Sequence, residues 1–348
     1  MRTAEFDFDL PAELIAQHPV EPRDRSRLMV LDRRTGRIQH RTFNELPEFL
    51  DPRDTLARNV TRVMPARLLG HREATGGKWE GLFLRERPGG CWEMLASTRG
   101  RPSLDERFVV GQDLAITLEG RDEAGRWIVR PAVSSDLATL STAEILERCG
   151  ETPLPPYIRK GREGPGDRDR YQTIYARFPG SVAAPTAGLH FTDEVLGRLA
   201  EKGITSVDLT LHVGIGTFRP IEADRIDDHV LHEEWAELSS ETATLLEERR
   251  KRGGRIVAVG TTSARTLETA ASASGSIEPF TGPTAMYLKP GHTFQGLDAL
   301  ITNFHLPRSS LLVLVSALAG IEPVRAAYAE AIRERYRFYS YGDAMLIL

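Results

Sequence analysis

The order of hydrophobic and polar positions divides the chain into three segments of different texture. In the first, residues 28–32 form an apolar run that predicts a strand, and residues 38–42 are expected to pair back on it after the turn at Gly36. Asn44 is a candidate N-cap for a short helix over residues 45–50. This opening segment, residues 1–59, is therefore expected to contribute a hairpin and a short helix.

The second segment, residues 60–131, has shorter apolar runs and more frequent turns. Its predicted strands are residues 67–70, 79–85, 91–96, 107–110, 114–118 and 127–129. Glycines such as Gly76, Gly111 and Gly125 lie between them. Short strands at regular spacing with turn residues between them favour a small antiparallel β-barrel.

The third segment, residues 132–348, alternates strands with helices. Residues 207–213 alternate apolar and polar side chains with a period of two, and residues 256–259 form a short buried strand that a helix follows. Further helices are expected after Ser141, over residues 169–177, after Thr192, after Ser240, after Ser309 or Ser310, and over residues 322–336. Alternation of this kind predicts an α/β fold. We therefore expect a discontinuous α/β catalytic domain, residues 1–59 and 132–348, with the barrel of residues 60–131 inserted into it.

Composition narrows the classes of protein that fit. The chain has 348 residues and a formal net charge of -4, which argues against a protein that coats nucleic acid non-specifically but allows a local basic face. Cys91 and Cys149 lie far apart and are expected to be structural thiols. The N-terminus has no apolar run of signal-peptide type, and the longest apolar stretch, residues 311–319, is too short to cross a bilayer. A cytoplasmic protein without a membrane segment is expected.

Stretches rich in Gly, Thr, Ser, Asn and His fall where turns are expected, at residues 184–192, 211–218, 260–265, 302–307 and 339–345. The turn from Gly260 into the following helix offers free N–H groups that can hold an anion, and Arg265 would reinforce them. An ordinary capped turn explains this segment equally well and is favoured when it is taken alone. Gly214 and Gly216 do not make a dinucleotide fingerprint, because the third glycine and the following helix are missing.

The histidines raise the possibility of a metal site. His229 and His232 are close to helical spacing, and His190, His212 and His305 all lie near expected turns. No HExxH pattern accompanies them, so a metal-dependent hydrolase remains a minor alternative, and a structural role is the default for any one of them. No nucleophile elbow and no Walker-type loop is present.

Taken together, these stretches resemble one family, the S-adenosylmethionine:tRNA ribosyltransferase-isomerases. The resemblance covers nearly the whole chain and is densest in residues 179–192. It is also carried by residues 6–11, 22–28, 61–68, 171–176, 211–218, 260–268, 302–307 and 336–345.

The resemblance implies an α/β domain with an inserted β-barrel and a defined reaction. The enzyme would take a tRNA with a GUN anticodon that carries 7-aminomethyl-7-deazaguanine at the wobble position. It would transfer and isomerise the ribosyl group of S-adenosylmethionine onto the aminomethyl group, giving epoxyqueuosine, adenine and methionine. S-adenosylmethionine is then a cosubstrate, with no prosthetic group and no metal, and a monomer is expected.

The resemblance also suggests residue roles. A base would remove the C5′ proton next to the sulfonium, and a histidine of near-neutral pKa suits this step. We hypothesise that His190 and His305 are the acid–base pair, with Asn303 beside them. The remaining candidates are substrate-binding residues Thr186, Gly188, Gly214, Gly216, Thr261, Thr262, Arg265 and Asp343, and tRNA-binding residues Arg62 and Arg67. Asp343 would hold the amino or ribose groups of the cosubstrate, and the two arginines would meet phosphates.

Two departures from the family pattern stand out. Val60 replaces the aspartate of the usual Asn-Asp-Thr-Arg, and Tyr287-Leu288-Lys289 replaces a more aromatic pattern before Pro290. If the family's aspartate acts in the site, its replacement by Val60 would impair activity or alter substrate preference. If that aspartate serves only a domain hinge, activity would be retained, and this is the outcome we expect. The alternatives are a paralogue that uses S-adenosylmethionine on another acceptor, a non-catalytic RNA-binding relative, and the metal-dependent hydrolase.

Overall fold

The chain forms two compact units. The computed structural model describes residues 1–214, 216, 220–271 and 275–348. Unit 1 comprises Met1–Arg62, Pro155–Lys160 and Arg170–Leu348, and unit 2 comprises Val63–Leu154 and Gly161–Asp169. Unit 2 therefore includes segments after residue 131, the predicted end of the barrel domain.

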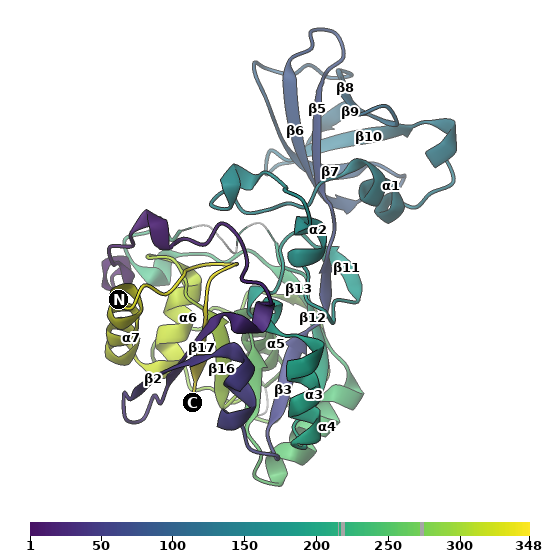
Figure 1. Ribbon diagram of the computed structural model, residues 1–348. Helices are drawn as coiled ribbons and strands as arrows, with labels where there is room; N and C mark the ends of the chain where they lie inside the picture. The colour runs from purple at the N-terminus through teal and green to yellow at the C-terminus, as the bar shows by residue number, and fades with distance from the viewer. Residues whose placement is uncertain (215, 217–219, 272–274) are drawn as a thin grey trace. The chain divides into compact units, whose positions relative to one another are not determined.

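Unit 1 is built on a nine-stranded sheet of order β15-β13-β12-β3-β14-β16-β17-β1-β2 (Figure 1). Its strands are β1 (Arg27–Leu31), β2 (Ile38–Thr42), β3 (Thr55–Asn59), β12 (Thr205–Leu211), β13 (Glu234–Leu238), β14 (Ile256–Val259), β15 (Phe280–Thr284), β16 (Ala299–Asn303) and β17 (Ala344–Ile347). Neighbours β12, β3, β14 and β16 run parallel, whereas β15–β13, β13–β12, β16–β17 and β1–β2 are antiparallel. The carboxyl ends of β14 and β16 therefore meet at one edge, where open α/β sheets commonly bind ligands.

Helices cover both faces of this sheet. Met29 and Leu31 belong to one apolar core, and Leu28 and Val30 to the other, because successive strand residues point to opposite faces. The first core includes residues from α4 (Ser240–Lys251), α5 (Thr261–Ala271), α6 (Ser310–Ala319) and α7 (Ile321–Arg333). The second includes residues from α3 (Asp193–Glu201) and the 3-10 helix η4 (Phe43–Phe49). All four residues of β14 are buried, as its continuous apolar run predicts.

Unit 2 contains a closed antiparallel barrel of order β10-β7-β6-β5-β8-β9. Its strands are β5 (Arg67–Arg72), β6 (Lys78–Glu86), β7 (Trp92–Thr98), β8 (Arg107–Val110), β9 (Leu114–Arg121) and β10 (Trp127–Val133). Phe108 fills the interior between Trp79 and Trp127, with ring centroids 5.4 Å from each. The predicted fold class, an α/β fold with a small antiparallel barrel, is confirmed.

The remaining elements are short. They are β4 (Thr61–Val63), β11 (Phe178–Ser181), α1 (Thr142–Cys149), α2 (Asp167–Arg170), and the 3-10 helices η1 (Thr3–Phe6), η2 (Ala12–Leu14), η3 (Arg23–Arg25), η5 (Ser135–Leu137), η6 (Arg159–Gly161), η7 (Thr186–His190) and η9 (Ile226–Asp228). α1 begins after Ser141, whose side chain accepts from the Glu144 backbone N–H, as predicted.

Two local predictions are wrong. The helix expected over residues 169–177 ends at Arg170, because Tyr171 is fully buried and the Arg177 backbone N–H donates instead to the Val60 carbonyl at 2.7 Å. The helix expected to start after Asn44 is the 3-10 helix η4, which starts at Phe43. Its N-cap is Thr42, whose backbone N–H donates to the Glu45 carboxylate at 2.7 Å.

The helices are short for a membrane span. Among the described residues, no single helix combines the length and the apolar character needed to cross a bilayer. Helices α6 and α7 meet these criteria only as a pair, and the pair is bent by 117° at the break between them.

Candidate active site

A pocket lies where β14 and β16 end, and we call it the strand-end pocket. Gly260 follows β14 with φ of 88°, and α5 begins at the next residue. This left-handed conformation is readily adopted only by glycine, and it lets the chain turn directly from strand into helix. The pocket is lined by Ala184, Pro185, Thr186, Ala187, Val213, Gly260, Thr261, Thr262, Thr302, Asn303, His305 and Leu311.

Five of the residues predicted from sequence line this one pocket. They are Thr186, Thr261, Thr262, Asn303 and His305. They come from three stretches far apart in the sequence: η7, the start of α5 and the end of β16.

His305 is held in the pocket wall by contacts on its side chain and its backbone. Its Nε2 lies 2.7 Å from the Thr302 hydroxyl, and its backbone N–H donates to the Tyr328 hydroxyl at 3.0 Å. The residue is 9% exposed. The imidazole is therefore fixed in orientation while it still forms part of the pocket surface.

His190 reaches the pocket only through Asn303. The Asn303 carboxamide oxygen accepts from the Thr186 hydroxyl at 2.9 Å, so its NH₂ group donates to His190 Nε2 at 3.1 Å. The opposite ring nitrogen, Nδ1, then carries the proton and donates to the Ser26 hydroxyl at 2.7 Å. Ser26, His190, Asn303 and Thr186 thus form a connected hydrogen-bonded chain that orients the asparagine.

Burial keeps both histidines neutral. It lowers the pKa of His305 to about 3. Burial, and then the charges of Arg337 and Arg23, lower the pKa of His190 to about 3. The expectation of a near-neutral pKa for these histidines is therefore wrong, because neither imidazolium would be solvated in the fold.

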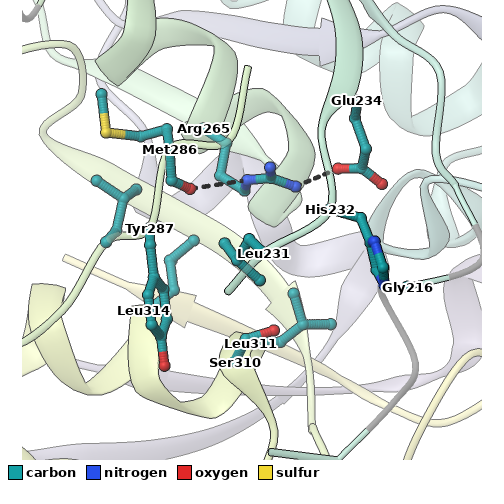
Figure 2. A pocket seen from close by; sticks show the side chains of 11 residues that line it. Gly216, Leu231, His232, Glu234, Arg265, Met286, Tyr287, Ser310, Leu311 and Leu314 are labelled. Atoms are coloured by element: carbon teal, nitrogen blue, oxygen red, sulfur yellow. Dashed lines mark hydrogen bonds and ion pairs between the residues drawn. The ribbon is translucent and has the colours of Figure 1, made fainter. Parts of the chain in front are cut away.

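A second pocket shares Leu311 with the first, and we call it the Arg265 pocket. It is lined by Gly216, Leu231, His232, Glu234, Arg265, Met286, Tyr287, Leu288, Ser310, Leu311 and Leu314. Figure 2 shows Arg265 between the Met286 carbonyl and Glu234, with apolar side chains around the rest of the space. Arg265, predicted as an anion ligand, thus lies in a separate compartment from Thr262.

Both predicted glycines of residues 211–218 lie beside this second pocket. The Gly214 backbone N–H donates to Glu234 Oε1 at 2.8 Å. A Cβ on Gly216 would lie 2.3 Å from His232 Cδ2, so the chain passes this histidine too closely for a side chain. Positions 215, 217 and 218 of the same predicted stretch lie outside the described residues.

The structure places other candidates away from these pockets. A Cβ on Gly188 would lie 2.2 Å from the Tyr175 hydroxyl, so Gly188 serves close packing. The Asp343 carboxylate is buried and accepts from the backbone N–H groups of Arg27 at 3.0 Å and Arg337 at 2.8 Å. Burial raises the pKa of Asp343, although those two amides oppose the shift.

The two arginines proposed to meet tRNA differ in their surroundings. Arg62 is exposed in β4. Arg67 is only 14% exposed in its side chain, and its guanidinium is paired with Glu80 at 2.8 Å and donates to the Gly161 carbonyl. Arg67 therefore has less freedom to meet a phosphate than Arg62.

Val60 is 1% exposed and joins three segments through its backbone. Its N–H donates to Leu209 at 2.9 Å, and its carbonyl accepts from Arg177 and Phe178. The carboxylate of Asp208, the residue before Leu209, pairs with Arg58 and Arg177. Position 60 is thus a structural junction within unit 1, and the hinge interpretation of the missing aspartate stays a prediction.

Sequence reasoning missed Glu234. The residue starts β13, whose burial alternates so that Glu234 is buried while Trp235 is 41% exposed. A glutamate in the buried phase of an alternating strand is a usable signal, because a buried carboxylate requires a partner. Ser26 and Thr302 carried no comparable signal, since single hydroxyl residues are common throughout the chain.

Two of the histidines that raised the metal alternative pack against aromatic rings. His229 lies edge-on to the Tyr287 ring at 5.8 Å, and His212 stacks on Trp235 at 5.6 Å. Within residues 1–214, 216, 220–271 and 275–348, no cluster of three or more His, Cys, Asp or Glu side chains is arranged to hold a metal ion.

Comparison with known proteins gives consistent matches over the whole chain. The sequence model of the family described as "Queuosine biosynthesis protein" matches residues 3–347. An S-adenosylmethionine:tRNA ribosyltransferase-isomerase of Symbiobacterium thermophilum is 52% identical, and one of Caldanaerobacter subterraneus subsp. tengcongensis is 49% identical, each over 100% of both chains. The crystal structure of an S-adenosylmethionine tRNA ribosyltransferase from Thermotoga maritima is similar with a TM-score of 0.57 and 40% identity, covering 99% of this chain and 100% of that one.

Proposed function

The chain belongs to the queuosine biosynthesis protein family and has its tRNA ribosyltransferase-isomerase activity, and from this premise we propose that the strand-end pocket is where the reaction occurs. The observation that supports this assignment is the convergence of Thr186, Thr262, Asn303 and His305 on one pocket. S-adenosylmethionine and a tRNA are the substrates.

The reaction transfers and isomerises the ribosyl group of S-adenosylmethionine onto 7-aminomethyl-7-deazaguanine at the tRNA wobble position, with release of adenine and methionine. The aminomethyl nitrogen gains a bond to the ribosyl group and loses a proton to solvent. The glycosidic bond to adenine and the C–S bond to methionine break, and adenine leaves with the electron pair of its bond and takes up the proton removed from C5′. One new bond within the isomerised ribosyl group fills the remaining positions vacated on the sugar. The electron pair of the C–S bond leaves with methionine, so the positive charge of the sulfonium is discharged.

In our proposal His305 is the base that removes the C5′ proton. Burial lowers its pKa, so the imidazole is neutral at physiological pH and one ring nitrogen is unprotonated. The neighbouring sulfonium acidifies the C5′ C–H, which eases its transfer to this weak base. Asn303, Thr186 and Thr262 supply hydrogen bonds to the ribose or adenine, and His190 is a positioning residue that acts through Asn303.

For the tRNA we propose that Arg62 contacts a backbone phosphate and that Arg67 contributes less, because Glu80 already pairs with it. Replacing Arg62 with Gln should weaken binding and reduce the dependence of log K on log salt by about one unit. We also propose that the acceptor tRNA has a GUN anticodon, that the enzyme is a monomer and that it acts in the cytoplasm. Competition with other anticodon stem-loops and sedimentation analysis test the first two.

The test of the proposed function is a direct assay. The protein is incubated with S-adenosylmethionine and an anticodon stem-loop that carries the 7-aminomethyl-7-deazaguanine base, and mass spectrometry follows the ribosyl adduct and free adenine. We expect both products despite Val60. Adenine release without the acceptor would favour a different acceptor, and RNA binding without either product would favour a catalytically impaired relative.

A further inference from the structure

We propose that the Arg265 pocket binds the amino-acid end of S-adenosylmethionine, with Arg265 taking its carboxylate and Glu234 its ammonium group. The inference rests on the proposed function, because it assumes that the ribosyl and adenine groups occupy the strand-end pocket. The inference adds to the proposed function a second subsite, the direction in which the cosubstrate lies, and a role for Glu234.

The two pockets adjoin, and their linings match the two ends of the cosubstrate. Leu311 at the start of α6 lines both, so the two pockets are neighbours on either side of this residue. The strand-end pocket offers the hydroxyl and amide groups that a ribose and a purine need. The Arg265 pocket offers Leu231, Met286 and Leu314, which suit the two methylene groups and the methyl group beside the sulfonium.

The polar end of the Arg265 pocket is a buried charge pair. Arg265 and Glu234 have side chains 7% and 4% exposed and form an ion pair with each other. An α-amino acid carries one carboxylate and one ammonium group on the same carbon. Adjacent groups of opposite charge on the protein are the matching arrangement, and a buried guanidinium binds a carboxylate in a fixed geometry.

The Arg265 guanidinium retains donors for a ligand. A guanidinium has five N–H donors, and contacts with described residues use three of them: Nε to the Met286 carbonyl at 3.1 Å, Nη1 to Glu234, and Nη2 to the Thr284 carbonyl at 3.5 Å. The last of these contacts is at the outer limit of a hydrogen bond. The Glu234 carboxylate accepts from Arg265 and from the Gly214 N–H at 2.8 Å among its contacts, and an ionised carboxylate has about four acceptor positions.

The Arg265–Glu234 pair is also held in position by the protein itself, without a ligand. Glu234 begins β13, Arg265 lies on α5, and the carbonyls that hold Arg265 belong to the end of β15 and the residues after it. A buried ion pair generally contributes less to stability than apolar residues of similar volume. Its placement in the wall of a pocket next to the proposed site of reaction therefore favours recognition of a charged ligand.

The test compares ligands that lack one charged group each. Binding of S-adenosylmethionine, its decarboxylated analogue and its deaminated analogue to the full chain is measured by calorimetry without tRNA. We expect the wild type to bind S-adenosylmethionine about tenfold or more tightly than either analogue. R265Q should bind S-adenosylmethionine about tenfold more weakly than the wild type, but the decarboxylated analogue less than about threefold more weakly. E234Q should likewise lose about tenfold in affinity for S-adenosylmethionine and less than about threefold for the deaminated analogue.

Matched controls are E322Q and R325Q, which alter an exposed pair on α7 and should change no affinity. Equal losses for all three ligands in R265Q, with folding verified by circular dichroism, would mean that the pair only supports the structure and would overturn the inference. Equal affinities of the wild type for all three ligands would overturn it without any variant. Turnover of tRNA by the wild type is measured in parallel, so failure of this subsite is distinguishable from failure of the proposed function.

Discussion

At the scale of single residues, the site depends on side chains that are neutral, buried and fixed. His305 lines the pocket with its Nε2 held at 2.7 Å from Thr302, whereas His190 is separated from the pocket by Asn303. Two histidines that look equivalent in the sequence therefore receive different roles. Of the two, His305 is the one placed to exchange a proton with a ligand in the pocket.

Replacing His305 with Gln should reduce single-turnover adenine release by about 100-fold or more, the usual contribution of a general base. The glutamine amide can still meet the Thr302 hydroxyl, so thermal stability should change little. The measurement uses saturating S-adenosylmethionine and stem-loop. His71→Gln, at an exposed position in the barrel, is the matched control. Wild-type turnover in the His305 variant would remove this residue from the mechanism.

The role of His190 is tested by a double-mutant cycle. If His190 acts only through Asn303, H190Q should lower kcat with little change in KM, and the double variant H190Q/N303A should be no slower than N303A alone. If His190 were merely structural, the fold-losses in kcat of the two single variants would instead multiply in the double variant. The split between kcat and KM, together with non-additivity, decides between the two.

At the scale of elements, patterns that repeat along the chain were predictable and contacts between distant segments were not. The six barrel strands and β14 follow from local alternation and apolar runs. The helix expected over residues 169–177 fails because its backbone bonds to Val60, more than a hundred residues earlier. The glycine- and threonine-rich turns were recognisable as a set, but their division between two pockets depends on how β13, β14 and β16 are ordered in the sheet.

The barrel offers a prediction at this scale. A Cβ on Gly81 of β6 would lie 2.4 Å from the Trp79 ring, so G81A should overpack the interior and destabilise unit 2 by about 1–3 kcal/mol. A Cβ on Gly120 of β9 would meet no atom within 4 Å, so G120A is the matched control with little effect. Denaturant unfolding followed by tryptophan fluorescence measures both. Equal stability of the two variants would contradict the packing described for Trp79.

At the scale of the whole molecule, the proposed catalytic groups and both pockets lie in unit 1, and the barrel is a separate compact unit. The sequence predicted the barrel through its short apolar runs and frequent turn residues. It did not reveal that residues 132–154 and 161–169 belong to the same unit, because helix α1 and the turns after it resemble the α/β segment locally. The charge balance of the chain as a whole, -4, also gave no indication of the buried pair formed by Glu234 and Arg265.

The buried histidines give the molecule a defined acid sensitivity. The pKa values of His190 and His305 fall from about 6.5 in the unfolded chain to about 3 in the fold. The unfolded state therefore binds more protons between these values, and stability that is fully present above pH 6.5 is lost as pH falls towards 3. Each histidine should contribute about 1.4 kcal/mol per pH unit in this window.

Urea unfolding at pH 7, 6 and 5 measures this slope, before most carboxylates titrate. H190Q and H305Q should each reduce it, whereas His71→Gln, at an exposed position, should leave it unchanged. An unaltered slope in both buried variants would show that these histidines do not change protonation on unfolding.

The order of the nine-stranded sheet bears on how the protein behaves when it is concentrated. A closed barrel presents no free strand edge, but the sheet of unit 1 ends in β15 and β2, and an open edge is a template for pairing with another molecule. β15 carries Pro283, which has no N–H to donate, and β2 carries the charged Arg41. Both edges are thus poor templates, so self-association through added strands should be disfavoured at the high concentrations at which many sheet proteins aggregate.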